Sequence, residues 1–416
     1  MINIIFLPWR DIHNYRKEGF RVRESNILKN LSERSDINKI LIVNRARNFK
    51  SVVLKKTTGM EIKSEILPNK TLIYEYFGSK LFKITENIFS LELPWYFLNK
   101  GDNELENYLL FQKYLMFIIN KISRLLEIDL NSKNTWVWSS DLTRSYIFKE
   151  LNNKGLNCIK IFDTIDNLTE HGAYTHKQKE KNKERYKEVD QNVDIIFSVS
   201  KANLEILYKN PYVKKYHIEN GVDIERFGKF HRIKEKNKKT ICGYVGVIES
   251  RVNFDLLREI AIKTPEIEYK LVGPVLDSNN HTLDQLQKLN NVHFVGPVSF
   301  EEIPSVINNF DVCIIPHVIN NFTKSMSPLK FYEYLAANKP IIMTQVPPAD
   351  SVSKVKGVYI ANTVEEWLAA LEKAKKFHEE ELKNDTERQL LIQRHSWKQI
   401  VDHMVNCVLN TSSEVI

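Results

Sequence analysis

The chain has 416 residues, of which 43% are hydrophobic and 27% are charged, and its formal net charge is +8. This length is too great for one ordinary domain and predicts two, each large enough for its own hydrophobic core. No window reaches the roughly 18 uninterrupted apolar residues of a membrane-spanning helix, so the composition indicates an ordinary soluble globular protein.

The positive charge is compatible with a nucleic acid, an anionic membrane surface or an acidic substrate as partner. Lysines are dense in residues 174–187 and 229–239. Neither segment has aromatic residues at a spacing typical of nucleic-acid binding. For each we therefore place a solvated surface first, contact with acidic lipid headgroups second and nucleic acid last.

The cysteines and the N-terminus both indicate a cytoplasmic location. The four cysteines are far apart in the sequence, without the paired spacing of a metal site, and we expect buried free thiols: Cys158, Cys242, Cys313 and Cys407. The apolar run at residues 1–10 is too short for a secretion signal and lacks a basic leader, so it predicts a first strand.

The first residues predict a βαβ unit and hence a parallel sheet. Strands are expected at 4–7 and 39–43, with a helix at 24–32 between them. Loops at the carboxyl ends of parallel strands line ligand sites, so Gly19, Arg21 and Arg23 are candidates to face a substrate. A purely structural loop is the alternative.

Three aromatic residues, Trp95, Tyr96 and Phe97, precede a long helix expected at 104–126. If they are exposed, they form an apolar landing surface. If they are buried, they anchor the helix, which is the interpretation we favour. Further strands are expected at residues 135–139, 158–163 and 195–200.

A polar cluster follows the strand at 158–163 and contains Asp163, Asp166 and His171. Acidic residues and a histidine directly after a buried strand lie where an α/β sheet presents its functional groups. Such groups can position or deprotonate an incoming hydroxyl. Capping of the next helix by Asp166 or Asn167 is the alternative.

The boundary between the domains is expected where the composition turns basic and poor in apolar residues. The first domain is assigned to residues 1–225 and the second to 226–394. A terminal helix within 395–416 has apolar residues at helical spacing and is expected to return to the first domain. Just before the boundary, Asn220-Gly221 predicts a turn.

A second βαβ series begins at residues 240–248 and continues with strands at 268–272, 292–295 and 312–316. All four strands should end at one edge of a sheet. Gly246, at the end of the first of them, would let the backbone approach a phosphate closely. Tight packing is an equally good explanation of this glycine.

The segment that follows, residues 321–343, carries the strongest functional pattern. We expect a helix capped by Ser327, with Pro328 in its first turn, that runs to about Ala337. Lys330 and Glu333 share one side of it, opposite an apolar side formed by Leu329, Tyr332, Leu335 and Ala336. Free N–H groups at its start, with Lys324 and Lys330, would bind an anion such as a diphosphate. The alternative is an amphipathic helix whose Lys and Glu are merely solvated.

These motifs, in this order, resemble a GT-B glycosyltransferase of the retaining family 4, and in particular enzymes of teichuronic acid, capsule and exopolysaccharide synthesis. The resemblance spans nearly the whole chain and is carried by residues 162–166, 220–223, 243–246, 291–297 and 327–340. It implies an α/β fold of two Rossmann-like parallel-sheet domains that face each other across a cleft.

The resemblance also implies roles. Glu333 would bind the ribose of a nucleotide-sugar donor, Ser327, Pro328 and Leu329 its diphosphate, and Pro297 and Val298 its base. Gly246, Lys324 and Lys330 would lie by the phosphates, with Lys330 stabilising the leaving group. Catalytic groups on the acceptor side would be Asp163, Asp166 and His171, near Gly19, Arg21 and Arg23.

Several partners follow from this resemblance. The donor would be a UDP- or GDP-sugar and the acceptor a glycan or lipid-linked glycan, with no cofactor and no metal. The protein would be cytoplasmic, with peripheral attachment to the anionic inner face of the cell membrane and no nucleic-acid partner.

Two departures from the family pattern keep other functions open. Ser325 stands eight residues before Glu333, where the family often has a second glutamate, and Leu256 stands five residues after Arg251, where it often has a lysine. A catalytically silent binding or scaffold protein on the same fold is one alternative. An epimerase or hydrolase of nucleotide sugars is another.

Overall fold

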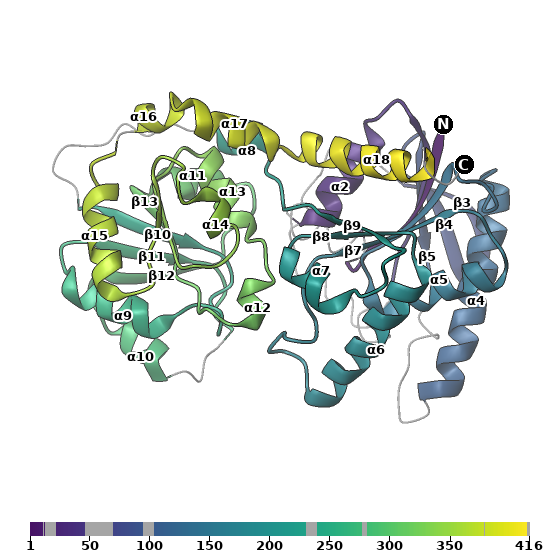
Figure 1. Cartoon of the computed structure of the whole chain (residues 1–416), viewed down its shortest axis with the longest axis horizontal. Coiled ribbons are helices and arrows are strands. Elements are labelled where there is room, and N and C mark those ends of the chain that lie inside the picture. The colour runs from purple at the N-terminus through teal and green to yellow at the C-terminus, as the bar shows by residue number, and fades with distance from the viewer. Residues whose placement is uncertain are drawn as a thin grey trace. The chain divides into compact units, whose positions relative to one another are not determined.

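The computed structural model describes residues 1–10, 12, 22–45, 70–94, 104–229, 239–276, 281–377 and 379–413. Contacts divide the chain into two compact units, each with its own sheet (Figure 1). Unit 1 comprises Met1–Thr169, Tyr174–Ile218 and His403–Ile416, and unit 2 comprises Glu170–Ala173 and Glu219–Asp402. Two α/β units with mainly parallel sheets confirm the predicted fold class.

Unit 1 has a nine-stranded sheet in the order β3-β4-β5-β2-β1-β6-β7-β8-β9. Strand β4 is antiparallel to both of its neighbours, and the other pairs are parallel. The strands are β1 (Ile2–Leu7), β2 (Ile37–Val43), β3 (Thr71–Tyr76), β4 (Ser79–Lys83), β5 (Ile88–Glu92), β6 (Thr135–Ser139), β7 (Ile159–Thr164), β8 (Ile195–Ser198) and β9 (Lys214–His217).

Helices cover both faces of this sheet because its buried strands are apolar on both sides. Helices α4 (Glu104–Leu125), α5 (Tyr146–Asn153) and α6 (His176–Asn192) pack on the face that carries Leu7 and Phe162. Helix α2 (Arg23–Ser32) and the end of α18 (Trp397–Ser413) lie on the other face (Figure 1). The 3₁₀ turn η2 (Leu142–Arg144) and α7 (Lys201–Leu207) complete the unit.

The sheet of unit 2 has six parallel strands in the order β12-β11-β10-β13-β14-β15. The strands are β10 (Ile241–Val245), β11 (Glu268–Val272), β12 (Val292–Gly296), β13 (Val312–Ile315), β14 (Ile341–Met343) and β15 (Val358–Ile360). Successive connections therefore run outward in opposite directions from the β10–β13 pair. Ligands of such sheets bind at the carboxyl ends of the strands at this switch point.

Alternate residues of β10 enter two separate cores. Cys242 and Tyr244 pack with α9 (Phe254–Lys263), α10 (His281–Gln287) and α15 (Val364–Ala374) on one face. Ile241 and Val245 pack on the other face. The helices that contribute to this second core are α8 (Ile224–Phe227), α11 (Ile303–Asn308), α13 (Leu329–Ala336), α14 (Ala349–Val352) and α17 (Thr386–Arg394). The short α12 (Asn321–Lys324) and α16 (Glu379–Lys383) complete unit 2.

Most elements that the sequence predicts are present, with small differences at their ends. The hairpin of β3 and β4 was not predicted. The four cysteines are free and buried, as expected. Within the described ranges, no helix combines the length and the apolar character that crossing a membrane requires.

Candidate functional site

The residues that carry the functional pattern meet at the switch point of unit 2. Gly246 directly follows β10, His317 follows β13, and the same connection leads through α12 into α13, which carries Lys330. The strands of unit 2 therefore end at one edge of the sheet, as expected, and these loops lie beside that edge.

Gly246 has a backbone conformation that favours glycine, and it lies close to Lys330. Its φ is +143°, and a Cβ atom built on it would lie 2.8 Å from Nζ of Lys330. The neighbouring loop is equally close, because a Cβ on Gly273 would lie 2.0 Å from the carbonyl oxygen of Gly246. The structure therefore brings Gly246 and Lys330 together, as a close approach of the backbone to a ligand requires.

The nearest contact of the Lys330 amine is the phenol of Tyr244, not a carboxylate. Its Nζ donates a hydrogen bond of 2.6 Å to the phenol oxygen of Tyr244 and lies 3.9 Å from the centre of that ring. The phenol in turn donates to the carbonyl oxygen of Val247 at 3.0 Å. Burial, and then the charge of Arg251, hold the pKa of Lys330 well below its ordinary value.

A bound anion would reverse this effect, because it would favour the charged form of Lys330. Glu333 and Glu249 already act weakly in that direction. A negative group that binds beside this amine would therefore stabilise its charged form.

The imidazole of His317 and the guanidinium of Arg251 both lie near Lys330. His317 is 1% exposed, and within the described part of the chain neither of its ring nitrogens has a hydrogen-bond partner. Burial lowers its pKa well below the ordinary value, as do the charges of Lys330 and Arg251. The imidazole is therefore neutral at physiological pH. Arg251 pairs with Glu249.

The predicted start of the helix was wrong by one residue. Helix α13 begins at Leu329, with Pro328 as its N-cap and no side-chain cap. Ser327 does not cap it, because its hydroxyl accepts a hydrogen bond of 3.2 Å from the backbone N–H of Asn220. The Asn220 amide also donates to the Ser327 carbonyl oxygen at 2.6 Å. No turn is present at the predicted Asn-Gly position, but the loop after β9 that contains Asn220 contacts the start of α13.

The remaining donor-side candidates in unit 2 differ in their exposure. Glu333 is partly exposed on α13, one turn from Lys330, while Tyr332, Leu335 and Ala336 are buried as expected. Lys324 is exposed at the end of α12. Pro297 and Val298 follow β12, where Pro297 is exposed and Val298 packs against the core.

In unit 1, two of the acceptor-side candidates bind each other. The guanidinium of Arg23 donates to both carboxylate oxygens of Asp163, at 2.9 and 3.1 Å, and the two side chains are almost fully buried. A buried pair of this kind ties the start of α2 to the end of β7. The assigned acceptor role of both residues stays a prediction.

The other acceptor-side candidates are dispersed. Asp166 is partly exposed after β7, and its carbonyl oxygen accepts a hydrogen bond of 2.8 Å from the Tyr186 phenol. His171 belongs to the short segment Glu170–Ala173, which groups with unit 2, and its Nδ1 accepts from the N–H of Ala173. Gly19 and Arg21 lie outside the described residues.

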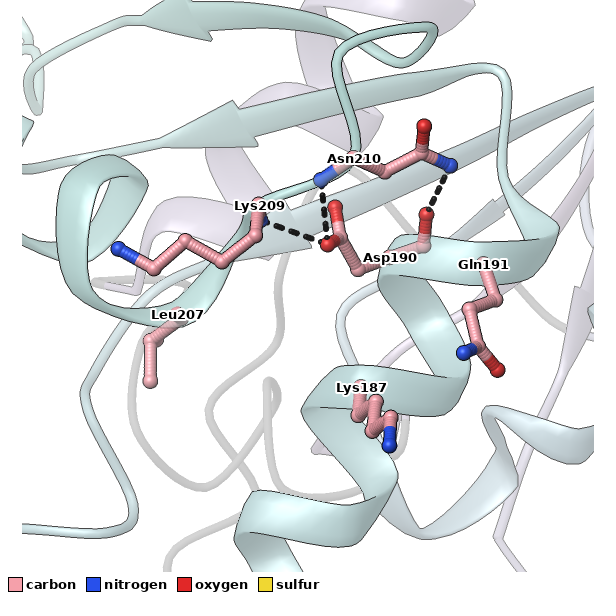
Figure 2. A pocket seen from close by; sticks show the side chains of 6 residues that line it. All are labelled: Lys187, Asp190, Gln191, Leu207, Lys209 and Asn210. Carbon is pink, nitrogen blue, oxygen red and sulfur yellow. Dashed lines mark hydrogen bonds between the residues drawn. The ribbon is translucent and has the colours of Figure 1, made fainter.

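Unit 1 also contains a pocket of about 540 Å³, lined by Lys187, Asp190, Gln191, Leu207, Lys209 and Asn210 (Figure 2). The Asp190 carboxylate accepts from the backbone N–H groups of Lys209 and Asn210 at 2.7 and 2.8 Å. These bonds hold the chain after α7 against the end of α6. No residue that the sequence analysis singled out for chemistry lines this pocket.

In the described ranges, no three or more His, Cys, Asp or Glu side chains are grouped so that they could hold a metal ion. The expectation of a metal-free site stays a prediction.

Comparison with known proteins gives a family match within the second half of the chain. Residues 239–375 match the family model of the glycosyl transferases group 1. A Bacillus subtilis (strain 168) protein named as a teichuronic acid biosynthesis glycosyltransferase, TuaH, is 26% identical over 250 residues. That match covers 57% of this chain and 56% of the relative, so the chain spans about half the length of the curated relative that it matches.

Solved structures share the fold over the full chain. A sucrose-phosphate synthase from Thermosynechococcus elongatus is 13% identical, with a TM-score of 0.66 and 100% of both chains covered. An α,α-trehalose 6-phosphate synthase from Burkholderia multivorans is 11% identical, with a TM-score of 0.66 and the same coverage. These likenesses show that the fold is GT-B.

Proposed function

We propose, from the glycosyltransferase group 1 domain that residues 239–375 form, that the chain transfers a sugar from a nucleoside-diphosphate donor to a glycan or lipid-linked acceptor. The observation that carries the proposal is the pair formed by Gly246 and Lys330 at the switch point. It combines a close backbone approach with an amine whose nearest contact is a neutral phenol.

The reaction breaks the bond between the sugar carbon and the donor phosphate and forms a bond to an acceptor oxygen, which loses its proton. Negative charge therefore grows on the leaving diphosphate. Lys330, with Arg251 nearby and the N-terminus of α13, would stabilise that charge. This set of groups would suffice without a metal ion. Asp166 would position the acceptor hydroxyl or take its proton.

Finer features belong to the same proposal. We expect a UDP- or GDP-sugar as donor, retention at the sugar carbon, and a role in bacterial surface polysaccharide synthesis, as in the name of the relative TuaH. A lipid-linked acceptor would place the protein at the inner face of the cell membrane. The net charge of +8 supports attachment to that anionic surface.

Incubation of the full chain with UDP- and GDP-sugars tests the proposal. Nucleoside diphosphate should be released only when glycan or lipid-linked acceptors are present, and a chelator should not change the rate. Release without acceptor would indicate a hydrolase, and conversion of the donor sugar would indicate an epimerase. Each of these results would contradict the proposed transfer.

One observation favours a second candidate, a binding protein without activity. Ser325, which replaces the frequent glutamate of the family, is fully buried, and its hydroxyl donates to the Phe322 carbonyl oxygen at 2.6 Å. It offers no carboxylate to a sugar. Tight nucleotide binding without turnover for any donor and acceptor would support this candidate instead.

A further inference from the structure

An exposed apolar surface extends over the β3–β4 hairpin and helix α4 of unit 1. In the described part of the chain, six of the fifteen exposed large hydrophobic side chains belong to these elements or to the turn between the strands. The six are Leu72, Ile73, Phe77, Leu110, Phe117 and Leu125. A concentration of this kind indicates an interaction surface, whereas exposed apolar side chains that occur singly are normal.

Phe77 is the most prominent of these residues. It lies in the two-residue turn of the hairpin, where its φ is +47° and that of Gly78 is +75°. Such turns favour Asn or Gly at both positions, and a bulky residue is uncommon there. The chain nevertheless holds a phenylalanine at this tip, with 68% of its surface exposed.

Ring contacts join the tip of the hairpin to α4. Tyr76 contacts Phe117 with ring centres 5.9 Å apart, and Phe77 contacts Tyr114 at 6.3 Å. The Tyr114 phenol also bonds to the hydroxyl of Ser79 at 2.7 Å. The tip of the hairpin is therefore held against the helix.

The same side of α4 is basic. From Leu110 to Leu126 the sequence has no acidic residue. Lys113, Lys121 and Arg124 recur at helical spacing with Phe117, and Nζ of Lys121 lies 4.0 Å from the centre of the Tyr76 ring. Among the described residues, none of these three cations forms an ion pair. They remain available to an anionic partner.

We propose that this hairpin–α4 surface docks on an anionic membrane. Phe77 and Phe117 would enter the headgroup boundary, and the cations of α4 would contact acidic headgroups. The inference rests on the membrane attachment proposed above and assigns a surface to it. The lysine-rich α6 is a weaker candidate, because no large hydrophobic side chain is exposed among its described residues.

Sedimentation of the full chain with vesicles of equal parts phosphatidylglycerol and phosphatidylcholine tests the proposal. Phe77→Asn should weaken binding about tenfold or more through lost apolar contact, while the turn itself is preserved because Asn suits its backbone. The combined variant Lys113→Gln/Lys121→Gln/Arg124→Gln should weaken it about 100-fold, at about fivefold for each cation. Added salt should release the wild-type chain.

Two matched controls stay on unit 1. Tyr212→Asn removes an aromatic ring that is 91% exposed elsewhere, and Lys177→Gln/Lys179→Gln/Lys181→Gln removes equal charge from α6. Both should bind vesicles as the wild type does, and melting curves should show that every variant is folded.

Three results would overturn the inference. Loss of binding only in the α6 variant would move the contact to that helix. A self-association that Phe77→Asn abolishes, in a chain that ignores vesicles, would make the surface a contact between copies through the β3 edge. Absence of vesicle binding in a wild-type chain that still binds nucleotide would contradict the membrane attachment but leave the sugar-transfer proposal intact.

Discussion

Among single residues, Lys330 has the largest role in the proposed chemistry. Its nearest partner, Tyr244, is neutral and keeps its own hydrogen bond to Val247. Lys330→Ala should therefore leave the fold intact while it removes a charge-assisted bond to phosphate, worth about 1.5–3 kcal/mol. We expect affinity for UDP or GDP to fall about tenfold to a hundredfold and affinity for the nucleosides to stay nearly constant.

Titration calorimetry measures both affinities. Lys354→Ala, which removes an exposed lysine elsewhere in unit 2, is the matched control and should bind as the wild type does. Equal losses of nucleotide and nucleoside binding in Lys330→Ala would mean that Lys330 does not act on phosphate.

The lowered pKa of Lys330 predicts that diphosphate binding takes up a proton. Bound phosphate should raise that pKa toward or above its ordinary value, so a window opens between the free and bound pKa values. Within this window affinity should fall as pH rises, by at most about tenfold per pH unit. Titrations in buffers of different ionisation heat, above about pH 7.5 where the phosphate is ionised, would reveal the uptake. Its persistence in Lys330→Ala would assign it to another group.

Asp166→Asn separates the acceptor side from the donor side. The change keeps the size of the side chain but removes the carboxylate, so turnover should fall about a hundredfold or more if Asp166 acts as a base. Nucleotide affinity should be nearly unchanged. A folded variant that no longer binds nucleotide would place this loop at the donor instead.

Single-residue roles were the part that sequence could least predict. That Gly246 and Lys330 meet could be anticipated, because strand ends of a parallel sheet share an edge. The direction of side chains could not be predicted, because it depends on packing across the fold. Examples are the contact of Lys330 with Tyr244 and the buried bond between Arg23 and Asp163. His317 was not singled out as a candidate.

Among the elements, the start of α13 depends on the loop after β9 that contains Asn220. Asn220→Ala should leave the buried carbonyl oxygen of Ser327 without its partner and lower the free energy of unfolding by about 1–3 kcal/mol. Nucleotide affinity should also fall, because the first turn of α13 would lose its support. Denaturant unfolding and nucleotide titration measure the two effects. Asn384→Ala, at an exposed site of unit 2, should change neither.

Elements with a clear apolar period were predicted well, as β1, β2, β6, β11 and α4 illustrate. Ser327 misled the prediction of a helix cap, because a residue distant in sequence binds its hydroxyl. The hairpin of β3 and β4 had a signal in Phe77-Gly78 between two alternating segments. It was overlooked because Phe is uncommon in such a turn.

At the scale of the whole molecule, His317 should make unit 2 less stable in acid. Its pKa is lowered on folding, so below the ordinary value of about 6.5 the unfolded chain binds a proton that the folded unit excludes. Stability should therefore fall as pH drops through that value, by at most about 1.4 kcal/mol per pH unit, until the folded pKa is reached. Thermal unfolding of the wild type and of His317→Phe across this range should diverge. Parallel curves would mean that His317 is charged or solvated in the folded protein.

The two-unit plan and the fold class could be predicted because both sequence halves repeat strand, helix and strand with polar residues at the strand ends. The predicted boundary fell in the basic segment after Arg226, whereas the contacts divide the chain at Glu219. Composition indicates where an exposed connection lies, whereas the division between the two units follows from packing. Gly221, for example, lies against His395 and Trp397 of unit 2.

The central claim, that unit 2 holds a nucleotide-sugar donor at α13, is tested most directly by titrating UDP and GDP into the wild type and Glu333→Gln. Glu333→Gln keeps the size of the side chain and removes the charge that would strengthen its bonds to ribose, so affinity for the matching nucleotide should fall about one to two orders of magnitude. Because Glu333 is partly exposed, the melting temperature should barely change. Equal nucleotide binding by both proteins, or none by either, would contradict the claim.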